Sequence, residues 1–137
     1  MRHKGSKNEY EQERNLELFR CYKELLYQSK HIRRKEIFVK LVNMPCSRFW
    51  VSEFRAAIIL SEMFKGKPLS CVRRDSRDMY QEIFRRASII RKEHPNMEYF
   101  MLAFNVVNQP APRFYITPLT AEVIITRMLS QKRRKLL

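Results

Sequence analysis

The chain has 137 residues and a formal net charge of +14, with 28 Lys and Arg residues against 14 Asp and Glu residues. A hydrophobic share of 45%, with nine Phe, six Tyr and one Trp, excludes wholesale disorder. Only Gly5 and Gly66 are glycines, which excludes a glycine-rich phosphate loop and, because tight hairpin turns need glycine, favours a mainly α fold.

Residues 1–10 are predicted to form a basic, flexible arm, and residues 11–29 an amphipathic helix. The apolar face of this helix is formed by Leu18, Tyr22 and Leu25, which recur at helical spacing. Charged side chains cover its other face.

The apolar stretches at residues 37–42 and 99–107 suit either a helix or a strand, because both are rich in Val and Phe. We favour helices, since Asn43 and Asn108 would then cap them in the left-handed conformation. The alternative is a hairpin in which residues 37–42 pair with a strand at residues 48–52.

Each apolar stretch leads through an extended segment into a further predicted helix. Ser52 and Thr117 are the predicted N-caps, and the helices run over residues 53–64 and 118–131. Gly66 ends the first of them. Both helices are so apolar that we expect them to be central and buried rather than to act as recognition helices.

The second half of the chain repeats the first at a constant offset of 65 residues. Residues 15–63 match residues 80–128 without a gap, most densely at residues 42–52 and 107–117. We therefore predict a mainly α fold of two tandem trihelical repeats that pack as one compact domain and resemble helix-turn-helix units. The predicted divisions are repeat 1 at 11–66, a basic linker at 67–75, repeat 2 at 76–131, and a basic tail at 132–137.

The positive charge predicts a polyanionic partner, and nucleic acid is the first choice. It is divided evenly along the chain, with +7 in residues 1–70 and +7 in residues 71–137. The candidate nucleic-acid-binding residues are Arg20, Lys30, Arg33, Arg34, Lys35, Arg48, Arg73, Arg74, Arg77, Arg85, Arg86, Arg113, Lys132, Arg133, Arg134 and Lys135.

Consecutive aromatic residues in the extended segments should point to opposite faces. We expect Phe49 and Phe114 in the core and treat the outer members, Trp50 and Tyr115, as candidates for stacking on bases.

Arg48 and its counterpart Arg113 have two interpretations that the sequence leaves open. Each is preorganised beside a proline to bind a phosphate or carboxylate. Alternatively, each pairs with the carboxylate that both repeats share, Glu17 or Glu82.

No pattern of catalytic or metal-ligating residues stands out. The three histidines and three cysteines have no zinc-site spacing, and no nucleophile or phosphate-loop motif occurs. We expect no enzymatic activity, no cofactor and no metal. The odd number of cysteines, a polar N-terminal stretch and the lack of a long apolar run favour an intracellular protein with no membrane segment.

The string Pro-Ala-Pro-Arg-Phe-Tyr-Ile-Thr at residues 110–117 resembles a motif of small basic proteins of Bacteroidales genomes, phages and mobile elements. The resemblance covers mainly residues 105–128, and the first copy departs from it at Cys46, Ser47 and Trp50. It implies a phage or mobile-element setting and carries over no functional residue.

We therefore expect a non-enzymatic protein that binds nucleic acid, double-stranded DNA rather than RNA, mainly through phosphate contacts. It would be a regulatory or DNA-packaging factor in the cytoplasm of a bacterial host, or a virion-associated one. The alternative is a protein–protein adaptor, virion component or inhibitor whose basic surface docks an acidic partner.

Overall fold

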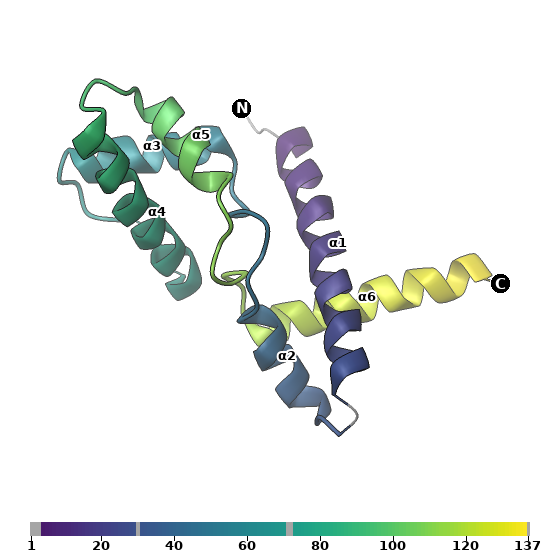
Figure 1. Ribbon diagram of the computed structural model, residues 1–137. Coiled ribbons are helices and arrows are strands. Elements are labelled where there is room, and N and C mark those ends of the chain that lie inside the picture. The colour runs from purple at the N-terminus through teal and green to yellow at the C-terminus, as the bar shows by residue number, and fades with distance from the viewer. Residues whose placement is uncertain (1–3, 30, 71–72, 137) are drawn as a thin grey trace. The chain divides into compact units, whose positions relative to one another are not determined.

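The protein is all-helical in the computed structural model, which describes residues 4–29, 31–70 and 73–136 (Figure 1). In this part of the chain there is no β-strand, and a single antiparallel bridge joins Cys46 to Ala111. The helices are α1 (Lys4–Gln28), α2 (Arg34–Val42), α3 (Glu53–Phe64), α4 (Arg74–Glu93), α5 (Tyr99–Val107) and α6 (Pro118–Leu136).

The choice of helix over strand is confirmed for both apolar stretches, since they form α2 and α5. The first helix begins earlier than predicted, at Lys4 rather than at residue 11, so the described part of the predicted arm at residues 1–10 is helical. The residues from Glu9 to Arg14 are mostly good helix formers without a breaker, so the helix extends toward the N-terminus. Residues 1–3 and Lys30 lie outside the described residues.

The predicted left-handed caps at Asn43 and Asn108 are wrong. Their φ angles are −95° and −88°, so neither residue enters the left-handed region. Each asparagine instead donates from Nδ2 to the carbonyl four residues earlier, at 2.8 Å to Val39 and 2.8 Å to Phe104. The side-chain amide therefore satisfies a C-terminal carbonyl without the unusual backbone conformation.

The end of α3 is set by Gly66, as predicted. Gly66 adopts a φ of +80°, and its N–H donates to the Met63 carbonyl while the Lys67 N–H donates to the Glu62 carbonyl. This is the hydrogen-bond pattern of a Schellman C-cap. Gln131 occupies the matching position in α6, where no such stop exists, and α6 continues to Leu136.

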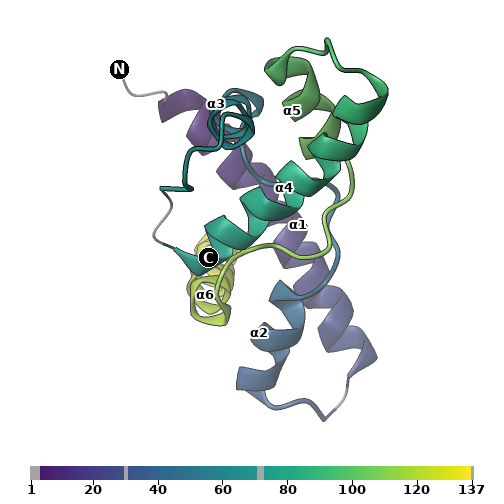
Figure 2. The ribbon, with the colours of Figure 1, turned by 90° about the vertical axis from the view of Figure 1, so that its left-hand side faces the viewer.

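The helices form two compact units. Unit 1 comprises Met1–Met44 and Pro112–Leu137 and so contains α1, α2 and α6. Unit 2 comprises Pro45–Ala111 and contains α3, α4 and α5. Within each unit every helix contacts the other two, and Figure 2 shows α2 beside α1 and α5 beside α4.

Each unit has an apolar core to which all three of its helices contribute. In unit 1, Leu18, Leu41 and Ile125 are almost completely buried. Burial of each such side chain contributes roughly 1.5–3 kcal/mol to the free energy of unfolding. Unit 2 is built in the same way, and its most deeply buried side chains include Phe49, Leu60, Ile83, Leu102 and Val106.

The extended segments before α3 and α6 attach these helices to their units by matching hydrogen bonds. In unit 2 the Phe49 N–H donates to the carbonyl of Val107, the last residue of α5, at 3.0 Å. In unit 1 the Phe114 N–H donates to the carbonyl of Val42, the last residue of α2, also at 3.0 Å. Each bond satisfies a carbonyl that its helix cannot pair internally.

Candidate nucleic-acid interface

The positive charge is unevenly divided between the two units, although it is evenly divided along the sequence. Unit 1 contains 17 basic and 7 acidic residues, a net charge of +10. Unit 2 contains 11 basic and 7 acidic residues, a net charge of +4. Unit 1 is therefore the stronger attractor of a polyanion.

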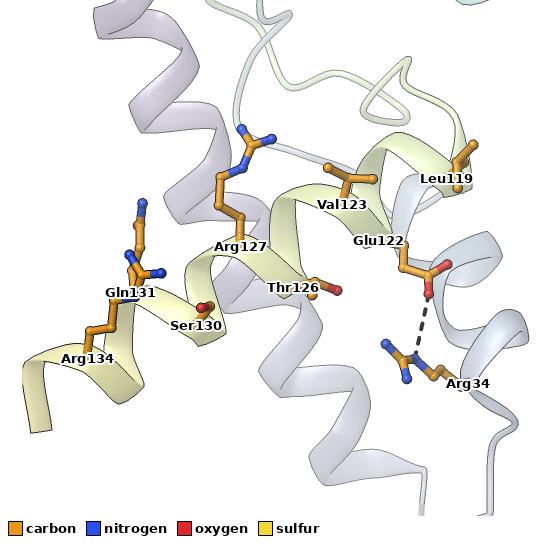
Figure 3. Close-up of a pocket in the computed structure, with 9 residues that line it drawn as sticks. All are labelled: Arg34, Leu119, Glu122, Val123, Thr126, Arg127, Ser130, Gln131 and Arg134. Atoms are coloured by element: carbon orange, nitrogen blue, oxygen red, sulfur yellow. Dashed lines mark ion pairs between the residues drawn. The ribbon is translucent and has the colours of Figure 1, made fainter. Parts of the chain in front are cut away.

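Helix α6 carries the exposed basic face of unit 1. The Thr117 hydroxyl accepts from the Thr120 N–H at 3.1 Å, so the predicted N-cap is confirmed, as is the Ser52 cap of α3. Ala121, Ile124 and Ile125 point into the core, which leaves the opposite side of α6 to solvent. The exposed polar and basic residues on that side, drawn in Figure 3, are Thr126, Arg127, Ser130, Gln131 and Arg134.

A shallow groove of about 570 Å³ follows this side of α6, and Arg34 from α2 lines it opposite Glu122. Arg34 Nε lies 3.6 Å from Glu122 Oε2, and the Arg34 side chain remains 74% exposed. Leu119 and Val123 add apolar surface and are 70% and 47% exposed. The groove thus combines cations, neutral hydrogen-bonding groups and apolar patches.

The basic end of α6 is held to α1. Lys132 Nζ lies 4.6 Å from the centre of the Phe19 ring, and Lys23 Nζ lies 5.2 Å from the same ring. These cation–π contacts orient the helix end while Arg133, Arg134 and Lys135 stay exposed.

The predicted binding residues are divided between the units. Lys30 lies outside the described part of the chain. Arg20, which is exposed and in unit 1, pairs with Glu17 at 3.3 Å. The predicted residues in unit 1 are Arg20, Arg33, Arg34, Lys35, Arg113, Lys132, Arg133, Arg134 and Lys135. Those in unit 2 are Arg48, Arg73, Arg74, Arg77, Arg85 and Arg86.

Arg48 is tied into its own segment. Its Nη2 donates to the Val51 carbonyl at 2.8 Å and to Glu53 Oε1 at 3.0 Å, and its Nε donates to the Phe49 carbonyl at 3.0 Å. The side chain is only 14% exposed. These contacts favour a structural role for Arg48. Its guanidinium binds the Glu53 carboxylate within the protein rather than a ligand.

Arg85 and Arg86 also form ion pairs within the protein. Both pair with Glu82, at 2.7 and 2.8 Å, and the Arg85 hydrogen bonds are the main reason that the pKa of Glu82 falls from 4.5 to about 2. Arg86 further donates to the Pro110 carbonyl at 2.8 Å and lies over the Phe49 ring. Arg86 therefore connects α4 to both extended segments within unit 2.

Arg91 is a further internal cation of unit 2. Its guanidinium lies 5.0 Å from the Phe64 ring centre and 4.7 Å from that of Tyr99, and so joins α4 to α3 and α5. Its Nη1 is buried without a hydrogen-bond partner. Arg48, Arg86 and Arg91 are thus cations of unit 2 that make contacts within the fold.

The predicted split of the aromatic pairs is confirmed. Phe49 and Phe114 are buried, whereas Trp50 and Tyr115 are partly exposed. An arginine guanidinium lies over the outer ring of each pair. Arg113 is 4.4 Å from the Tyr115 ring centre, and Arg48 is 5.5 Å from that of Trp50. Tyr115 has a φ of +58°, which is strained for a residue with a Cβ atom.

The expectation that α3 and α6 are buried is wrong for one side of each helix. Phe54 and Ile58 in α3 are 73% and 57% exposed, like Leu119 and Val123 in α6. Four residues that line the α6 groove were not among the predicted binding residues, which were chosen from clusters of charge. They are Thr126, Arg127, Ser130 and Gln131, and their helical spacing opposite the buried isoleucines was the sequence signal that could have identified them.

No group of three or more potential metal ligands occurs among the described residues. Burial raises the pKa of the Cys21 thiol, and nearby Glu17 adds to this effect, so the thiol is a poor nucleophile. Within the described residues, no helix has the length and apolar character needed to span a bilayer. Comparisons with protein-family models, curated proteins and solved structures found no match.

Proposed function

We propose that the protein is a non-enzymatic, DNA-binding protein that contacts duplex DNA mainly through unit 1. The observation that carries this proposal is the exposed basic face of α6 in a unit of net charge +10. The cations of this face are exposed, whereas Arg48, Arg86 and Arg91 in unit 2 are bound internally. The setting would be a bacterial cytoplasm, with a role in phage or mobile-element regulation or DNA packaging.

Phosphate contacts would supply most of the affinity. Each lysine or arginine that neutralises a phosphate releases condensed counterions, so log affinity should fall linearly with log salt. Arg133, Arg134 and Lys135 at the end of α6, with Arg33 and Lys35 near the start of α2, are the exposed cations best placed for this role in unit 1.

We further propose that the two units are copies of one helix-turn-helix-like module that have exchanged their third helices. The bounds of α5, Tyr99–Val107, lie 65 residues after those of α2, Arg34–Val42. The hydrogen bonds from Phe49 to Val107 and from Phe114 to Val42 also match at this offset, and each joins segments from different halves of the chain.

Fluorescence anisotropy with a random-sequence 30-base-pair duplex over a salt series tests the DNA proposal, with single-stranded DNA and RNA of equal length as comparisons. We expect the duplex to bind most tightly, with a salt slope that corresponds to several phosphates. If no nucleic acid binds at low salt, the proposal is wrong.

A second candidate function is that of a protein–protein adaptor. The observation that favours it is the apolar surface of unit 2, where the Phe54 and Phe100 rings meet at 5.1 Å and both remain exposed. Contiguous exposed apolar surface of this kind is typical of protein interfaces. Absence of DNA binding, together with loss of a protein partner in Phe54→Ser, would favour the adaptor.

A further inference from the structure

We propose that α6 enters the major groove of DNA and reads base pairs through Thr126, Arg127, Ser130 and Gln131. The inference rests on the proposed DNA-binding function and adds sequence selectivity to it. Its basis is the composition and geometry of the exposed α6 face.

The length and width of α6 suit the major groove of DNA. Nineteen residues of α-helix span about 28 Å, and the major groove, about 12 Å wide, admits one helix. The exposed residues lie three, four and seven positions apart, so they form one continuous face over successive turns. The opposite face is anchored by Ile124 and Ile125 in the core of unit 1.

The chemistry of this face differs from that of a phosphate-binding surface, which needs only cations. Arginine can bind O6 and N7 of guanine with two hydrogen bonds, glutamine can do the same with adenine, and Ser or Thr can bond either base. Here the neutral groups of Thr126, Ser130 and Gln131 lie among Arg127 and Arg134. They have the mixture of donors and acceptors that base edges require.

The part of the protein groove at the start of α6 also fits a duplex. There the exposed Leu119 and Val123 can contact thymine methyl groups. Glu122 lines the groove as well, and its negative charge is offset by Arg34 at 3.6 Å. Arg34 stays 74% exposed in that ion pair, so its guanidinium is accessible to a flanking phosphate.

Unit 2 lacks the corresponding surface, which points to one reading helix per chain. Helix α3 ends at Phe64, so the positions that match Ser130, Gln131 and Arg134 fall after its end. Its exposed side carries Phe54 and Ile58.

The test is selection of duplexes with a randomised 12-base-pair core by the full chain at 150 mM salt. We expect a consensus in which each wrong base pair lowers affinity about 5- to 150-fold. Gln131→Ala and Arg127→Ala should each abolish the preference at one position. Arg133→Ala, which removes the same charge outside the groove, should weaken all duplexes alike and keep the consensus.

The three residues are exposed, so circular dichroism should give wild-type helicity and melting temperature for each variant. Duplex binding without any consensus would overturn this inference but leave the proposed function intact. A consensus that neither Gln131→Ala nor Arg127→Ala alters would also overturn it. Failure to bind any duplex would overturn both proposals.

Discussion

Replacement of Arg48 by alanine should destabilise the protein, because this side chain is a structural link in unit 2. Arg48→Ala removes hydrogen bonds of 3.0, 2.8 and 3.0 Å to Phe49, Val51 and Glu53. Breaking a buried ion pair costs about 3–5 kcal/mol, and an exposed pair contributes about 0–1 kcal/mol. The Arg48 and Glu53 side chains are 14% and 18% exposed, so we expect a decrease in stability of about 2–3 kcal/mol.

Thermal and urea unfolding, followed by circular dichroism, measure this decrease. For a unit of this size, about 1 kcal/mol lowers the melting temperature by about 4–8 °C, so the expected change is about 10–20 °C. A double-mutant cycle with Glu53→Gln should give a coupling energy of about 1 kcal/mol or more. A destabilisation below about 0.5 kcal/mol with no coupling would refute the reasoning and return Arg48 to the ligand-binding candidates.

Three further predictions follow from individual contacts. Because the pKa of Glu82 is lowered to about 2, its charge stabilises the fold above pH 4.5, and this contribution is lost as the pH falls through 2. Glu82→Gln should therefore cost on the order of 1 kcal/mol at pH 7, after solvent screening, and clearly less at pH 2, as measured by urea unfolding. Ser52→Ala and Thr117→Ala should each cost about 1 kcal/mol in the same assay, whereas glycine at either position should restore most of it. Phe49→Ala should cost about 3–5 kcal/mol, because its side chain is fully buried, and an unchanged melting temperature would contradict that burial.

Local features of the fold were predictable where a residue imposes its own geometry. Gly66 marks the end of α3, and Ser52 and Thr117 mark helix starts, because each acts on the backbone beside it. The Asn43 cap was placed correctly but with the wrong conformation. An asparagine can satisfy a helix end with its backbone or its side chain, and sequence does not distinguish these.

The pairing of helices could not be read from the sequence. The buried residues of α3 and α6 are alike, with Ala56 and Ile59 matching Ala121 and Ile124. Either helix therefore presents similar apolar surface to the other helices, and periodicity cannot say which unit each one joins. The candidate site depended on this pairing, because it places α6 beside Arg34 and gives unit 1 its excess of charge.

The most direct measurement compares the salt dependence of duplex binding for two charge-matched variants. One carries Arg133→Gln and Lys135→Gln at the end of α6, and the control carries Arg55→Gln and Lys92→Gln on exposed positions of unit 2. We expect a shallower fall of log affinity with log salt for the α6 variant, by about 0.9 in slope for each phosphate that it no longer neutralises. The control should keep the wild-type slope. Equal changes in both variants would mean that overall charge, not α6, carries the binding, and would contradict the account.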